Sequence, residues 1–115
     1  MQYPIDLSTL LSSESGEIPR QLESFALLSL GVIESLMNGS LQPKDSIPFF
    51  FHGQNCRYIR KLGSKPGDEI MGRGVQLADL FDALPSEEAQ REFERELAVM
   101  RGLCARLLKK RRLVA

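Results

Sequence analysis

Residues 86–112 read SEEAQREFERELAVMRGLCARLLKKRR and form the longest amphipathic segment of the chain. Its apolar residues recur at alternating steps of four and three, the spacing of one helix face; they are Phe93, Leu97, Met100, Cys104 and Leu107. Ser86 suits an N-cap, acidic residues follow it, and a basic run ends the segment, as the helix dipole favours. We expect a helix of about 25 residues here.

A second long helix is predicted for residues 19–37, PRQLESFALLSLGVIESLM. Pro19 is favourable in a first turn, because its nitrogen has no hydrogen to leave unbonded, and Asn38-Gly39 is a typical helix stop. Apolar residues cover much of the circumference, which places this helix centrally. Gly31 weakens a helix interior, so we expect another backbone to pack closely against it.

Prolines and glycines divide the residues between these helices into short pieces. The expected elements are a short helix from Pro43 to near His52, a helix over 54–62 that ends at Gly63, a loop over 63–67, one helical turn over 68–73, and a short helix over 77–84 closed by Pro85. Gly74 is predicted to break the chain between the last two.

These patterns predict an all-α fold, a small helical bundle with two long antiparallel helices and several short helices. Residues 1–17 are rich in serine around a short apolar patch, so we expect an N-terminal tail that carries at most one or two turns of helix. Residues 18–115 are then a single helical domain, because 115 residues leave no room for a second domain of normal size.

Charge is balanced overall, with 15 basic and 15 acidic residues, but it is segregated along the chain. Residues 1–56 and 79–96 are acidic, whereas residues 57–73 and 101–112 are basic. No signal peptide is recognisable at the start, and the longest apolar block, residues 25–33, is far shorter than the roughly 20 residues that span a bilayer. We expect a cytoplasmic protein without a membrane partner.

Two stretches carry a family resemblance: residues 22–39, LESFALLSLGVIESLMNG, and residues 74–79, GVQLAD. They resemble a family of small, all-helical bacterial proteins of unknown function. In that family a Leu-Gly-Val-(Leu/Ile)-Glu helix precedes a Gly-Thr-Glu-Leu-Glu-Asp turn and a terminal helix, and the order of elements matches over residues 20–105. The resemblance implies a helical bacterial protein and carries over no catalytic residue, because the family has no assigned activity.

Catalytic and metal sites are poorly supported by the sequence. His52 and Cys56 are four residues apart and could face the same way on one helix, as a thiol and its base require, but no orienting group is identifiable. One His and two distant Cys fall short of a zinc site. Gly72-Arg73-Gly74 lacks the pattern of a phosphate-binding loop. We therefore expect no enzyme activity, no metal and no cofactor.

Three consecutive aromatic residues, Phe49, Phe50 and Phe51, form the first candidate partner site. Consecutive side chains point in different directions on any regular element, so a core seldom takes all three. An exposed Phe beside Ile47 and His52 would form an apolar patch of the kind that marks a protein-binding surface. The alternative is that the segment plugs the core from a loop, and the sequence favours neither reading.

The basic cluster Lys109, Lys110, Arg111 and Arg112 is the second candidate, because it is dense enough to contact a nucleic-acid backbone. Cations also belong at a helix C-terminus for dipole reasons alone. The apolar stripe of the terminal helix leaves a homodimer open as well. The function that the sequence favours is a non-catalytic protein interaction or regulatory module, and nucleic-acid binding is the alternative.

Overall fold

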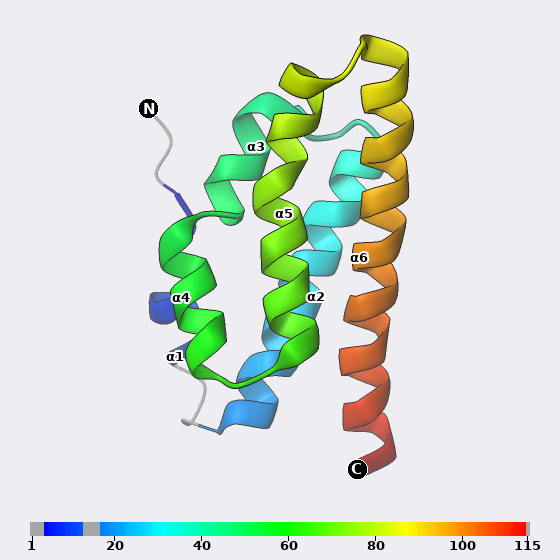
Figure 1. Cartoon of the computed structure of the whole chain (residues 1–115). Coiled ribbons are helices and arrows are strands. Elements are labelled where there is room, and N and C mark those ends of the chain that lie inside the picture. Colours follow the sequence, from blue (N-terminus) through cyan, green and yellow to red (C-terminus); the bar gives the residue numbers. More distant parts are fainter. Residues whose placement is uncertain (1–3, 13–16, 115) are drawn as a thin grey trace.

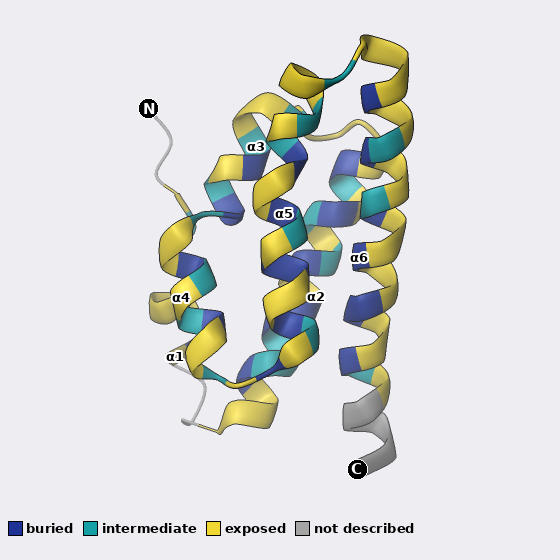
Figure 2. Ribbon diagram, viewed as in Figure 1, coloured by how far each residue is buried: buried dark blue, intermediate teal, exposed yellow. Residues whose placement is uncertain are grey.

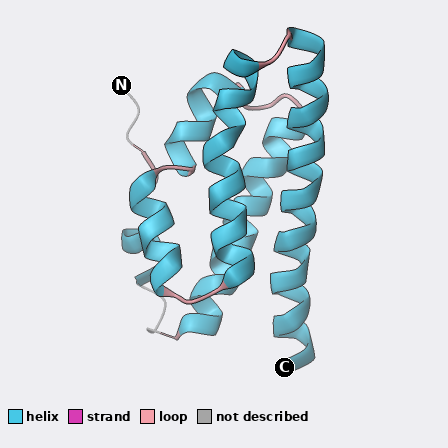
Figure 3. Cartoon of the chain, in the orientation of Figure 1, coloured by secondary structure: helices cyan, strands magenta, loops and turns pink. Residues whose placement is uncertain are grey.

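The chain folds into six α-helices, shown in Figure 1 for a computed structural model that describes residues 4–12 and 17–114, with side chains up to Lys109. The helices are α1 (Leu7–Ser12), α2 (Ile18–Met37), α3 (Pro43–Phe50), α4 (Gly53–Lys61), α5 (Lys65–Ala83) and α6 (Ser86–Val114). The described residues contain no strand (Figure 3). The predicted all-α fold is confirmed.

Helix α6 runs antiparallel to α2, as predicted, and it packs along both α2 and α5 (Figure 1). It begins at Ser86 and is 29 residues long. All five apolar residues of its predicted stripe are buried, while its opposite face is exposed (Figure 2). Helix α6 therefore joins the other two long helices through one side of its surface.

Helix α5 is a third long helix of 19 residues, where we predicted one turn and a separate short helix. The Ser64 hydroxyl caps its start by accepting a hydrogen bond of 3.0 Å from the Gly67 amide. The predicted break at Gly74 is wrong, because α5 continues through this residue. The Phe51 ring packs directly on the α5 backbone at this position. The contact with Phe51 offsets the helix penalty of glycine.

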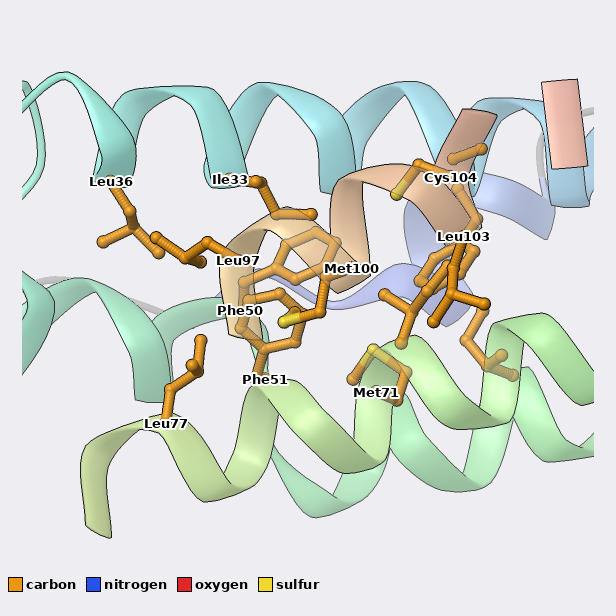
Figure 4. Close-up of a cluster of buried hydrophobic side chains, with 14 of the residues drawn as sticks. Ile33, Leu36, Phe50, Phe51, Met71, Leu77, Leu97, Met100, Leu103 and Cys104 are labelled. Atoms are coloured by element: carbon orange, nitrogen blue, oxygen red, sulfur yellow. The ribbon is translucent and has the colours of Figure 1, made fainter. Parts of the chain in front are cut away.

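Two aromatic rings fill the space between the long helices (Figure 4). Phe50 and Phe51 come from the end of α3 and lie between α2 and α5, with Leu97 and Met100 of α6 beside them. The Phe50 ring stacks on Phe25 of α2 at a centroid distance of 6.5 Å and meets Phe51 edge-on at 5.0 Å. The aromatic run thus supplies core volume for all three long helices.

The helix ends mostly follow the sequence signals. Gly39 and Gly63 have the positive φ angles, 81° and 75°, that glycine adopts without strain after a helix. Helices α3 and α4 lie within two residues of their predicted ends. The expectation for Gly31 is wrong within this chain, since a Cβ atom added there would meet no atom within 4 Å.

The segment at residues 4–12 is part of the domain rather than a tail. Leu7 and Leu11 of α1 are fully buried, and α1 packs on α2 and α4. The Asn55 side chain accepts a hydrogen bond from the Leu7 amide (2.9 Å) and donates to the carbonyl groups of Ile5 (3.0 Å) and Phe50 (2.7 Å). A buried amide on α4 therefore holds α1 and α3 together.

Candidate functional site

The three phenylalanines of the first candidate site have different environments. Phe50 is 1% exposed and Phe51 is 3% exposed, so these two cannot form a surface patch. Both side chains belong to the core, so the hypothesis of a partner-binding patch is wrong for Phe50 and Phe51. Phe49 is half-buried, and its side chain lines an open groove. Phe49 is thus the one member of the run that is available to a partner.

The groove lies between the segment at residues 4–5, α2 and α3, and its volume is about 1320 Å³. Its apolar lining comes from the N-terminal segment, α2, the loop after α2 and α3: Pro4, Ile5, Val32, Leu41, Pro48, Phe49 and Phe50. A backbone hydrogen bond of 2.9 Å from the Ile5 amide to the Phe49 carbonyl ties the N-terminal segment to α3. The groove therefore has a fixed edge where the N-terminal segment meets α3.

Polar side chains surround this apolar surface. Lys44 and Asp45 of α3 are both exposed at its border, with Ser40 and Gln42 from the loop between α2 and α3. Neither Lys44 nor Asp45 forms an ion pair with another described side chain. The Ser40 hydroxyl donates a hydrogen bond to the Asn38 side chain. An apolar centre with a mixed-charge border is the usual composition of a protein-binding surface.

The sequence identified Phe49 and Phe50 in this groove but not its other apolar residues: Pro4, Ile5, Val32, Leu41 and Pro48. Each segment contributes only one or two of them, and isolated exposed apolar residues are normal on a protein surface. The one available signal was the pair Pro48-Phe49, because a proline inside a short helix must lie where its missing hydrogen bond is tolerated. That signal identifies an outer face and does not identify its neighbours.

The His52 and Cys56 pair is not arranged for nucleophilic catalysis. His52 Nε2 lies 2.8 Å from the Ile5 carbonyl oxygen. Because a carbonyl oxygen only accepts, this nitrogen carries the hydrogen and donates the hydrogen bond. Burial raises the pKa of the Cys56 thiol, despite the opposing effect of the nearby Arg60, whereas a reactive cysteine needs a lowered pKa. His52 therefore joins the start of α4 to the N-terminal segment, and Cys56 packs partly buried against the core.

Other polar groups in the described residues also have structural roles. Burial raises the pKa of the Cys104 thiol, inside the α6 core face, to about 11. A small cavity of about 250 Å³ between α5 and α6 is bordered by Arg73, whose Nη1 contacts both carboxylate oxygens of Glu96 at 2.8 Å. Those hydrogen bonds, and one to Glu69, raise the pKa of Arg73. No group of three metal-ligating side chains occurs among the residues that the structure describes.

The basic candidate site is described only in part. Lys109 is exposed, and the side chains of Lys110, Arg111 and Arg112 lie outside the described residues. The fold adds a second basic group that the sequence argument did not connect with it: Arg57, Arg60, Lys61 and Lys65 are all exposed. The C-terminal ends of α4 and α6 lie at the same end of the molecule, the lower end in Figure 1.

Comparisons with protein-family models, with curated proteins and with solved structures found no match to this chain. The resemblance of residues 22–39 and 74–79 to a bacterial family therefore stays a prediction. Among the helices described, none combines the length and the apolar character needed to cross a lipid bilayer.

Proposed function

We propose that this protein is a non-catalytic interaction module that binds an apolar segment of a partner polypeptide in the groove beside Phe49. The observation that carries this proposal is the size and lining of the groove. Small-molecule sites usually have volumes of roughly 300–1,000 Å³ and enclose most of their ligand. The groove is larger, at about 1320 Å³, and open to solvent along α3.

The lining favours a polypeptide with apolar side chains at its centre. Two prolines, Pro4 and Pro48, and the aromatic ring of Phe49 give a rigid apolar surface that loses little conformational entropy on binding. Lys44 and Asp45 at the border supply one charge of each sign, which favours a partner with polar groups flanking its apolar residues.

The test uses a displayed peptide library selected on the wild-type protein, with binding of the enriched peptides measured on variants. Leu41→Asp introduces a charge at an exposed loop position inside the groove, so the fold is retained and peptide affinity falls at least tenfold. Val75→Asp is the matched control, because Val75 is equally exposed but lies on α5, away from the groove. Circular dichroism checks both variants.

The expected result is enrichment of peptides rich in apolar residues, whose binding is lost in Leu41→Asp and kept in Val75→Asp. A library that yields no binder contradicts the proposal. So does a set of peptides that bind both variants as well as the wild type, because those peptides occupy another surface.

A second candidate function is contact with a nucleic-acid backbone at the basic end of the molecule. The supporting observation is that Arg57, Arg60, Lys61 and Lys65 are exposed and make no ion pair with the described residues, in contrast to Arg73, Arg95 and Arg101. Binding of a DNA or RNA duplex should then fall steeply with added salt, because counterions are released on contact. Neutralising Arg57, Arg60 and Lys61 should flatten that dependence, and a flat response of the wild type excludes this function.

A further inference from the structure

The outer face of α2 exposes large apolar side chains at its centre. Leu27 is 55% exposed, the most exposed of the large apolar side chains described, and the neighbouring Leu28 is also exposed. Gly31 lies one turn after Leu27, and a side chain there would meet no atom within 4 Å. Glycine weakens a helix interior, and no contact among the described residues requires a glycine at this position.

Two opposite charges flank this apolar centre at equal distances along the same stripe. Arg20 precedes Leu27 by seven residues and Glu34 follows it by seven, and seven residues make about two helical turns. Arg20 is exposed and forms no ion pair with a described residue. Glu34 remains half-exposed, although its Oε1 lies 3.3 Å from Nη1 of Arg101 on α6. Glu23 also lies on this side of α2, between Arg20 and Leu27, but it is half-buried and already has an interaction partner. The exposed residues of the stripe therefore run from a basic end through an apolar centre to an acidic end.

Such a stripe is complementary to its own antiparallel copy. If Leu27 lies opposite Leu27 of a second molecule, Arg20 of each copy meets Glu34 of the other, and two equivalent ion pairs form. A twofold axis uses the same surface on both subunits and closes the assembly at two copies. The order of charges along α2 thus matches a second copy of this chain.

The neighbouring surface of α6 allows the two molecules to approach. The Glu34–Arg101 ion pair marks the seam between α2 and α6, and the exposed residues around Arg101 on α6 have short side chains: Ala98, Gly102 and Ala105. Short side chains let helix backbones pack at the distance of about 8–10 Å that is usual in bundles. Two α2–α6 pairs can then form one four-helix layer.

We propose that two copies of this chain form a twofold symmetric dimer through the outer face of α2, with Leu27, Leu28 and Gly31 at its centre and Arg20 paired with Glu34 of the other copy. This dimer explains the glycine in the middle of α2 as the site where a second molecule approaches. It does not depend on the groove beside Phe49, so either proposal can fail without the other.

The first experiment measures the oligomeric state of the full chain by sedimentation over concentrations from roughly 1 μM to 1 mM, the range of moderate to weak interfaces. The wild type should sediment as a species of twice the monomer mass. Gly31→Leu should abolish the dimer while keeping the helix content, because the leucine has open space in the monomer. Gly72→Leu makes the same change at an open position of α5 and should leave the dimer intact.

The second experiment exchanges the charges. Arg20→Glu alone and Glu34→Arg alone place like charges opposite each other, so each variant should dimerise at least tenfold more weakly than the wild type. An equimolar mixture of the two should form a heterodimer, since each contact then joins Glu and Arg. A monomeric wild type, open-ended assembly, a dimer that survives Gly31→Leu, or a mixture no tighter than its components overturns the proposal.

Discussion

Gly74 lies in the middle of α5 because the Phe51 ring occupies the place where its side chain would be. From the sequence, a glycine inside a helical pattern predicts either a break or a close approach, and the two cannot be told apart without the neighbour. Gly31 and Gly74 show both errors. We expected close packing at Gly31, where the chain leaves open space, and a break at Gly74, where an aromatic ring packs.

Gly74→Ala should destabilise the protein by about 1–3 kcal/mol, the usual cost of forcing extra volume into a packed core. This cost exceeds the gain of up to about 1 kcal/mol that alanine brings to a helix interior. Gly72→Ala on the same helix adds its methyl group in open space and should stabilise the protein. Urea unfolding of both variants measures the difference, and equal effects would show that Phe51 does not restrict position 74.

Among the elements, α1 is the one whose place in the core the sequence did not show, because residues 1–17 were expected to be a tail with at most one or two turns of helix. Its six residues are too few to give a helical period of their own, and helices this short are not stable in isolation. Leu7 and Leu11 are buried because α4 offers a hydrogen-bonding side chain, Asn55, to the backbone before and within α1. That complementarity joins residues 48 positions apart, and no local pattern contains it.

Asn55→Ala should detach α1 from the domain. The Leu7 amide and the Phe50 carbonyl would lose their side-chain partner in a buried site, and each such loss costs about 1–3 kcal/mol. Proteolysis should then cut within residues 4–12 sooner than in the wild type, and hydrogen exchange at the Leu7 amide should accelerate. Gln54→Ala is the control, because Gln54 is exposed on the same helix. Unchanged cleavage in Asn55→Ala would mean that the leucines alone hold α1.

For the whole molecule, the helix pair α2–α6 could be predicted and the candidate groove could not. Amphipathic periodicity records which face of a helix is buried, so Leu97 and Met100 were assigned to the core without knowledge of their neighbours. The groove is made by Ile5, Val32 and Phe49, which come from three segments and share no spacing rule. Their meeting depends on the docking of α1, and this docking was missed.

All six helices contribute to one buried cluster, so the protein should unfold as a single cooperative unit. Leu97 lies fully buried on α6, and Leu97→Ala should lower the free energy of unfolding by about 2–5 kcal/mol. Tyr58 lies on α4 and its hydroxyl donates a hydrogen bond to Gln21 of α2, so in a Tyr3→Phe background, where Tyr58 is the remaining tyrosine, the fluorescence reports on a different part of the bundle from α6. The tyrosine signal and the far-ultraviolet circular dichroism should shift together in this variant.

Val99→Ala, at an exposed position two residues away, should change stability by less than about 0.5 kcal/mol. Separate transitions for the two signals would show that α4 and α6 belong to independent folding units.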